Sequence, residues 1–239
     1  MRRITFFTLV SIVALSLIVC TANAQHQRGW EAENYTDRSG EGMQIFNSPH
    51  SASDGGEYTI SDASGGAFIG SDNGAGGSSN SWFKYAFNAP VAGGWYLWLK
   101  GIGPPNSDNS FFWAIDIADE DAASADNDQI NIIDFNEAAG SSQNFPLGNP
   151  PPDGAIHDWM WFRAGSRSGP FSGVGDATPL ELSAGTHTLH IMDREDGAYL
   201  DAFYITTDAN FNANETEPIA VESQGKLATT WANLKGKTN

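Results

Sequence analysis

Apolar and polar residues alternate in short runs between residues 28 and 207, and glycine, asparagine, aspartate and serine separate the runs. Residues 82–88 place Phe83, Tyr85 and Phe87 on one face, as in a half-buried strand. Residues 95–100 carry large apolar side chains on both faces, which is typical of a strand in the middle of a sandwich. No segment between residues 25 and 207 has a long helical period. The pattern predicts an all-β domain built as a β-sandwich, with further strands at residues 111–117, 130–135, 157–163, 180–182, 186–192 and 199–206.

The first 24 residues have the features of a secretory signal peptide. A short basic start precedes an uncharged stretch from Ile4 to Cys20, and Ala22-Asn23-Ala24 has the small-x-small form of a cleavage site. We therefore predict a secreted protein, extracellular or periplasmic, whose mature chain starts near Gln25. A membrane anchor is the alternative, although the apolar stretch is short for a span. The only cysteine lies in this segment, so the mature chain forms no internal disulfide and a bound metal ion would be its natural cross-link.

These patterns divide the chain into a signal peptide (1–24), a β-sandwich (25–207) and a C-terminal tail (208–239). The tail starts as a polar, irregular segment, and Leu227, Trp231 and Leu234 then recur at helical spacing. We expect the tail to be partly disordered or to contain one short helix.

The charge balance is strongly acidic, with 29 acidic against 12 basic side chains and a formal net charge of −17. Nucleic acids and anionic membranes are bound through clustered lysine and arginine, so we expect neither as a partner, and no membrane insertion of the mature form. The chain also carries 8 tryptophans, more than a sandwich core of this size needs.

Common catalytic motifs are missing from the sequence. The segment from Gly165 to Gly169 has the glycine spacing of a nucleophile elbow but carries Arg167 at its centre. His187 and His190 lie three apart in a predicted strand, so they should face opposite sides and share no metal ion. We therefore predict a protein without catalytic activity. An enzyme that uses Asp193, Glu195 or Asp196 remains the alternative, since sandwich folds host both binders and enzymes.

Three carboxylates are the candidate metal ligands. Glu31 and Glu33 stand two apart in the first predicted strand and should project to the same face. Asp201 lies in an otherwise apolar strand, where a carboxylate is costly unless it is paired or bound to a metal. If the first and last strands are neighbours, the three would form a site for Ca²⁺, which prefers oxygen ligands. A solvated acidic face on an edge strand is the alternative interpretation.

The order of several short motifs resembles the carbohydrate-binding modules of the family 6 and family 35 type, which are galactose-binding-domain-like jelly-roll sandwiches. The resemblance covers about residues 30–206. The motifs that carry it are Glu31-Ala32-Glu33, Gly66-Ala67-Phe68-Ile69-Gly70, Trp82-Phe83-Lys84-Tyr85, the turn and strand at residues 182–189, and Leu200-Asp201.

The resemblance implies a structural Ca²⁺ bound by Glu31, Glu33 and Asp201. It also implies a sugar site in loops at one end of the sandwich, with Trp159 or Trp161 as the aromatic platform. The family often has Asn two positions before the aspartate of the last strand, and this chain has Tyr199 there. Tyr199 would then be a second aromatic wall, or the usual sugar site would be lost.

The remaining aromatic candidates adjoin irregular segments. We expect Trp113 and Phe171, with Trp159 and Trp161, to be exposed for sugar stacking, and Trp82, Trp95 and Trp98 to be packed in the core. The sequence thus predicts a secreted, non-catalytic module that binds an extracellular glycan or polysaccharide and carries a structural calcium ion. The alternatives are an adhesion or structural sandwich that binds protein at the cell surface, and a polysaccharide-degrading enzyme on the same fold.

Overall fold

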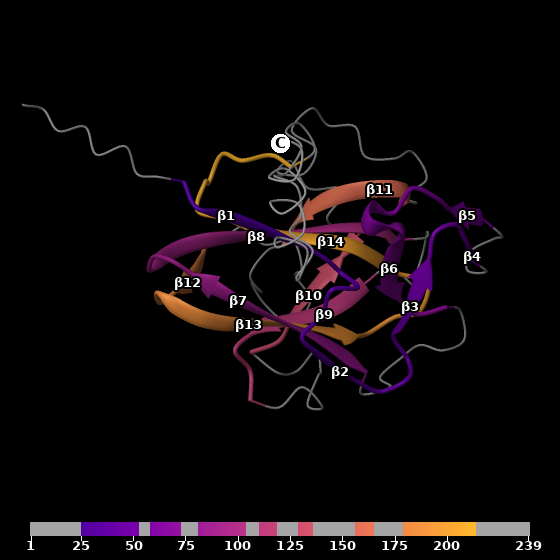
Figure 1. Cartoon of the computed structure of the whole chain (residues 1–239), viewed down its shortest axis with the longest axis horizontal. Coiled ribbons are helices and arrows are strands. Elements are labelled where there is room, and N and C mark those ends of the chain that lie inside the picture. The colour runs from indigo at the N-terminus through magenta and orange to yellow at the C-terminus, as the bar shows by residue number, and fades with distance from the viewer. Residues whose placement is uncertain are drawn as a thin grey trace, which may run out of the picture.

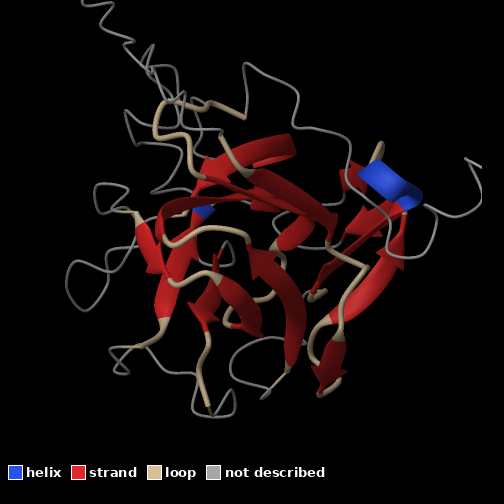
Figure 2. Ribbon diagram, turned by 60° about the vertical axis from the view of Figure 1, so that its left-hand side comes forward, coloured by secondary structure: helices blue, strands red, loops and turns tan. Residues whose placement is uncertain are grey.

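The computed structural model describes residues 25–52, 58–72, 81–103, 110–118, 129–135, 156–164 and 179–213. The predicted signal peptide, Phe171 and the tail beyond residue 213 lie outside these residues. The described chain consists almost entirely of strands and connecting loops (Figure 2). Within it there is no helix of the length and hydropathy that a membrane crossing requires.

Two antiparallel sheets form the body of the domain and lie one above the other (Figure 1). The first has seven strands, with the order β11-β8-β14-β6-β3 and with β1 and β12 added beside β14 and β8. Its strands are β1 (Gln27–Glu31), β3 (Gln44–Asn47), β6 (Ala67–Gly70), β8 (Gly93–Gly103), β11 (Ile156–Arg163), β12 (Leu180–Leu182) and β14 (Tyr199–Thr206).

The second sheet has five strands in the order β10-β9-β13-β7-β2. They are β2 (Asp37–Ser39), β7 (Trp82–Ala89), β9 (Ser110–Ile115), β10 (Asn131–Asp134) and β13 (Gly185–Asp193). A separate hairpin of β4 (His50–Ala52) and β5 (Tyr58–Ile60) projects beside β3 and β6 at one end of the molecule (Figure 1). Because the chain passes repeatedly from one sheet to the other, the arrangement is the predicted jelly-roll sandwich.

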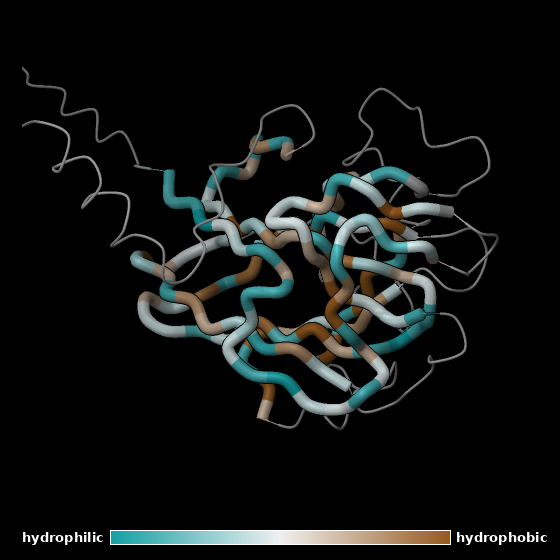
Figure 3. The backbone as a smooth tube through the Cα atoms, turned by 45° about the vertical axis from the view of Figure 1, so that its right-hand side comes forward, coloured by the Kyte–Doolittle hydropathy of each residue, from teal (hydrophilic) through white to brown (hydrophobic). Residues whose placement is uncertain are grey.

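The core lies between the two sheets. Phe83, Tyr85 and Phe87 alternate with half-exposed residues along β7, which confirms the period-two pattern. Tyr85 packs on Phe203 of the opposite sheet, with ring centroids 4.7 Å apart, and Phe87 meets Trp30 edge to face at 5.4 Å. Hydrophobic stretches run through the interior of the sandwich, whereas hydrophilic residues gather at turns and edges (Figure 3).

The outer face of the seven-stranded sheet is also covered. Trp98, Trp161 and Tyr204 form a second buried cluster there, and Phe211 stacks on Tyr204 with ring centroids 4.8 Å apart. This covering explains why β8 is apolar on both faces. The start of the predicted tail, residues 208–213, is therefore part of the folded domain.

β14 is the central strand of the seven-stranded sheet and carries one irregularity. It pairs with β8 on one side, and with β6 and β1 on the other. The register with β8 shifts between Leu200 and Ala202, so Asp201 is the extra residue of a β-bulge. The bulge lets this aspartate leave the regular alternation of the strand.

Candidate functional site

The three predicted metal ligands come together at the bulge of β14. β1 ends at Glu31, and the turn that follows is held by the amide of Ala32, which donates to the carbonyl of Asp201 at 2.8 Å. The Tyr85 hydroxyl also donates to the carbonyl of Ala32, at 2.6 Å. The first and last strands are therefore neighbours, as the sequence argument required.

A 3-10 turn at Ser64–Gly66 closes over these carboxylates. The Ser64 hydroxyl lies 2.8 Å from Glu31 Oε2 and 2.8 Å from Asp201 Oδ2. One hydroxyl has a single proton, so it cannot donate fully to two carboxylates at once. The Lys100 ammonium lies 2.7 Å from Asp201 Oδ2 and forms an ion pair with it.

Gly65 allows the turn to approach so closely. Its φ of +69° lies in the left-handed region, which favours glycine. A Cβ atom there would stand 2.6 Å from Glu33 Oε1 and 3.3 Å from Glu31 Cγ. The backbone of the turn therefore rests directly on the two glutamates.

The carboxylates carry more negative charge than the described surroundings balance. Burial, the charge of Glu31 and the charge of Asp201 raise the pKa of Glu33 to about 7, against a hydrogen bond from its own backbone. Burial also raises the pKa of Glu31, with the Asp201 charge adding to it and Ser64 and Lys100 opposing it. Two buried oxygens, Glu33 Oε2 and Asp201 Oδ1, receive no hydrogen bond within the described part of the chain.

The donor chemistry fits a hard cation, because the cluster supplies carboxylate and hydroxyl oxygens and leaves two of them unsatisfied. As the side chains stand, no three His, Cys, Asp or Glu residues among those described are gathered closely enough to hold a metal ion. A bound cation would therefore have to draw the carboxylates inward, and Lys100 would have to share Asp201 with it.

A second group of polar and aromatic residues lies at the start of β14, beside the β4–β5 hairpin. We call it the rim; its members are Phe46, His50, Phe68, Asp72, Trp159 and Tyr199. Asp72 Oδ1 accepts hydrogen bonds from the Tyr199 hydroxyl at 2.8 Å and from His50 Nε2 at 2.9 Å. The Asp72 side chain is 41% exposed, so the carboxylate remains open to solvent.

Trp159 is the predicted platform residue that the structure places at a surface. Its indole N–H donates to the carbonyl of Ser61 at 2.9 Å, and its ring meets Phe68 edge to face at 5.4 Å. The side chain is partly buried against this cluster and partly exposed. Two contacts thus fix the indole orientation while leaving part of it free.

The other predicted aromatic site residues that the structure describes are buried. The prediction that Trp113 is exposed is wrong: β9 lies between β10 and β13, and Trp113 points into the core with no exposed surface. Trp161 is also buried, at 9% exposure, because residues 208–213 cover its face of the sheet. Tyr199 is fully buried under the hairpin and offers no wall to a ligand.

Trp95 and Trp98 are packed, as predicted, whereas Trp82 is only partly buried, on the five-stranded sheet. The sequence argument missed Asp72, His50, Ser64 and Lys100. Lys100 carried a usable signal, because it is the one charged residue among the apolar outer positions of β8 and faces the one charged residue of β14. Asp72 stands in a Gly/Ser-rich segment and carried none.

The carboxylates of the enzymatic alternative are engaged in local structure. Asp193 is buried and accepts a hydrogen bond from Ser71 at 3.0 Å. Glu195 pairs with Arg194 and with the Ser110 hydroxyl. The contacts with Ser71 and Ser110 tie the end of β13 and the turn after it to the segment after β6 and to the start of β9.

Comparison with known proteins finds similar solved structures but no similar sequence. No family model and no curated protein sequence matches the chain. Solved structures that resemble it include carbohydrate-binding modules of families 6 and 35, the families that the sequence motifs also resemble, and enzymes such as an exo-beta-1,3-galactanase from Phanerochaete chrysosporium.

The C-terminal family 6 module of LamC, a laminarinase from Zobellia galactanivorans, is 16% identical with a TM-score of 0.42, covering 76% of this chain and 99% of that one. The module CBM6cm-2 from Cellvibrio mixtus lichenase 5A, solved with cellotriose, is 18% identical with a TM-score of 0.39, covering 75% and 96%. A family 35 module from Clostridium thermocellum is 10% identical with a TM-score of 0.40, covering 75% and 97%. At these values the likeness assigns no ligand and no residue role to this chain.

Proposed function

We propose that this protein is a non-catalytic carbohydrate-binding module whose ligand is an extracellular glycan or polysaccharide, and that the rim is its binding site. The observation that carries the proposal is the partly exposed indole of Trp159 in the same cluster as the solvent-open carboxylate of Asp72. A sugar ring presents an apolar C–H face that stacks on an indole, and its hydroxyls need fixed polar partners nearby.

The rim is preorganised for this task. The Trp159 indole is held through Ser61, and the Asp72 carboxylate is held by Tyr199 and His50, both through Oδ1. A site whose groups are already ordered loses less entropy on binding. Trp159 would stack on the sugar, and Asp72 would accept hydrogen bonds from its hydroxyls.

The proposal includes a structural Ca²⁺ held by Glu31, Glu33 and Asp201. When bound, the ion supplies positive charge to a cluster whose buried oxygens lack partners. These residues belong to β1, the turn after it and β14, so their shared ligation would tie the first strand to the last. With no cysteine after residue 20, the mature chain has no disulfide to do this. Secretion, through the predicted signal peptide, completes the proposal.

The test of glycan binding is an array screen with matched tryptophan variants. Trp159→Ala and Asp72→Asn should abolish retention on the glycan that the wild type binds. Trp82→Ala is the control, because Trp82 is also partly exposed but lies on the other sheet, with Lys84 4.2 Å from its ring centroid. Retention that survives both rim variants overturns the site, and a blank array from folded protein favours the protein-adhesion alternative.

The test of calcium is a pair of melting curves. If the ion binds only the folded state, EDTA should lower Tm by about 5–10 °C at ion concentrations near 100-fold above Kd. Glu33→Gln should melt no lower than wild type in EDTA, since it removes a poorly satisfied buried charge, yet should lose most of the gain from added Ca²⁺. A wild-type Tm that is unchanged by both EDTA and added Ca²⁺ contradicts the calcium proposal.

A further inference from the structure

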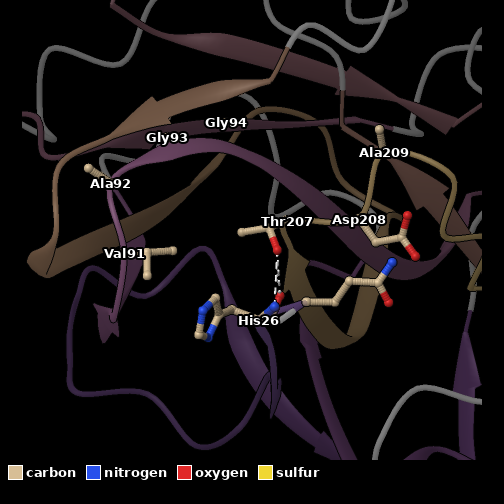
Figure 4. A pocket seen from close by; sticks show the side chains of 9 residues that line it. His26, Val91, Ala92, Gly93, Gly94, Thr207, Asp208 and Ala209 are labelled. Atoms are coloured by element: carbon tan, nitrogen blue, oxygen red, sulfur yellow. Dashed lines mark hydrogen bonds between the residues drawn. The ribbon is translucent and has the colours of Figure 1, made fainter. Parts of the chain in front are cut away.

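A hollow of about 490 Å³ lies at the far end of β14 from the rim (Figure 4). Three segments distant in sequence line it: residues 25–26 before β1, residues 91–94 in the β7–β8 turn and at the start of β8, and residues 207–209 after β14. The rim adjoins Tyr199 at the start of β14, whereas this hollow adjoins Thr207 just past its end. In Figure 1 the β4–β5 hairpin and the start of β1 accordingly lie at opposite ends of the molecule. We call this hollow the terminal pocket.

The walls of the terminal pocket are held by the backbone. The amide of His26 donates to Thr207 Oγ1 at 3.0 Å, and the amide of Thr207 donates to the carbonyl of His26 at 2.9 Å. The amide of Asn210 donates to Asp208 Oδ1 at 2.9 Å, which fixes the orientation of that carboxylate. On the facing wall, the carbonyl of Val91 accepts from the indole of Trp95 at 3.3 Å.

The lining combines planar polar groups on one side with small apolar residues and glycines on the other. Gln25, His26 and Asp208 contribute an amide, an imidazole and a carboxylate. The other wall is Val91, Ala92 and two glycines. Gly94 has no room for a side chain, because a Cβ atom would stand 2.7 Å from Pro179, so this part of the wall is backbone only.

This chemistry selects among ligand classes. Among the described residues the lining contains no lysine or arginine, and the nearby Arg163 donates to the carbonyl of Ala209 at 3.2 Å. The lining does contain a carboxylate, so it does not suit an anion. A single carboxylate is too few for a dedicated Ca²⁺ site, and a lining that is more polar than apolar does not suit a lipid. Planar amide, carboxylate and imidazole groups suit a neutral ligand rich in hydroxyls, and the volume lies within the range of small-molecule sites.

We propose that the terminal pocket is a second sugar site, which binds one neutral sugar unit independently of the rim. This rests on the proposed function for the class of ligand, but it assigns a different place and different residues. Asp208 and Gln25 would bond to the hydroxyls, and the Val91–Ala92 wall would contact the C–H face. Two sites at opposite ends would let one module hold two glycan chains.

Each site contains one histidine, which makes the two sites separable by NMR. His26 reports on the terminal pocket, and His50 reports on the rim through its bond to Asp72. The full-length secreted protein is titrated with the methyl glycosides of glucose, galactose, mannose and xylose, and the ring signals of both histidines are followed. At least one sugar should shift the His26 signals saturably.

Two variants test the assignment. Asp208→Asn keeps an oxygen for the Asn210 amide but removes the charge, and should weaken the His26 response about tenfold or more. Ala92→Trp fills the pocket from an exposed position and should remove the response. Asp37→Asn, an equal change of charge on exposed β2, and Trp159→Ala should leave it intact.

The outcomes separate this inference from the proposed function. If the sugars shift His50 but never His26, the terminal pocket is refuted while the rim stands. A His26 response that persists in both Asp208→Asn and Ala92→Trp refutes it too. If neither histidine responds and the array is blank, both proposals fail together.

Discussion

His187 is held in a way that requires two protons on its ring. Nδ1 lies 2.6 Å from Asp116 Oδ2, and Nε2 lies 2.9 Å from the carbonyl of Ser183. Both partners accept hydrogen bonds, and a neutral imidazole has only one N–H. The imidazolium alone satisfies both. The His187 ring also lies against the ring of Phe87 on β7, with ring centroids 5.6 Å apart and planes tilted by 34°.

The net effect on the pKa of His187 is upward. Burial lowers it, but the hydrogen bond to Asp116, the bond to the Ser183 carbonyl and the charge of Asp116 together outweigh burial. A group whose folded pKa is raised adds stability that is fully present below its unfolded pKa of about 6.5 and is lost as pH rises through the folded value. We therefore expect a stabilising contribution that is complete in mild acid and declines as pH rises above about 6.5.

The size of this stabilising contribution can be estimated from the contacts of His187. Hydrogen bonds to charged groups contribute roughly 1.5–3 kcal/mol each. His187 is buried at 7% exposure, but the Asp116 side chain is 47% exposed and its bond is screened by solvent. Replacing His187 by Gln, which keeps one donor and does not titrate, should therefore cost about 2 kcal/mol near pH 5.5.

The assay is urea unfolding of wild type and His187→Gln across pH, because the difference between them cancels other titrating groups such as Glu33. The difference should be constant below about pH 6.5, shrink as pH rises from there through the folded pKa, and level off above it. A difference that is flat, or that grows with pH, would refute the argument that both ring nitrogens donate.

Two further predictions concern the covering segments of the seven-stranded sheet. Gly65→Ala should lower the unfolding free energy, measured by urea denaturation, more than Gly66→Ala does. Both residues have positive φ, so a backbone strain of about 1–2 kcal/mol is common to both variants. Only the Cβ at position 65 would abut Glu33, whereas a Cβ at position 66 would have open space. Equal losses would show that the turn does not rest on the carboxylates. Phe211→Ala should lower the unfolding free energy by about 1–2 kcal/mol, because it uncovers Trp98 and the stacked ring of Tyr204. The same exposure should shift tryptophan fluorescence to the red. Unchanged emission would show that residues 208–213 do not cover this face.

The long strands were predictable from sequence because burial imposes a strict period on them. β7, β8, β13 and β14 contain the predicted segments 82–88, 95–100, 186–192 and 199–206, and β8 extends furthest beyond its prediction. The strands from β2 to β5 were not predicted. Each has three or four residues, and β2 and most of β3 are exposed, so no apolar alternation marks them.

Prediction of the candidate site residues was limited in the same way, because local patterns do not show which distant segments meet. Asp201 was chosen because a carboxylate among apolar residues is conspicuous in sequence, and Glu31 and Glu33 because they stand two apart in the first predicted strand. Trp113 was misplaced because the irregular segment beside it suggested exposure, whereas the pairing of β9 between two strands decides its burial. Asp72 depends on the β4–β5 hairpin and on Tyr199, which are brought together only by the tertiary fold.

β14 links all the features that bear on function. Its first residue supports Asp72 at the rim, its bulge presents Asp201 to the acidic cluster, and its last residue precedes the terminal pocket. The strand has eight residues, which corresponds to about 26 Å at the usual rise, so the two proposed sugar sites are separated by the length of the sheet. A short oligosaccharide bound at the rim therefore has no reach to the terminal pocket, and the two sites would act on different chains. The carboxylate cluster between them ties β1 to β14, and β1 in turn positions His26, so a cation bound at the cluster would stiffen the pocket wall as well as the fold.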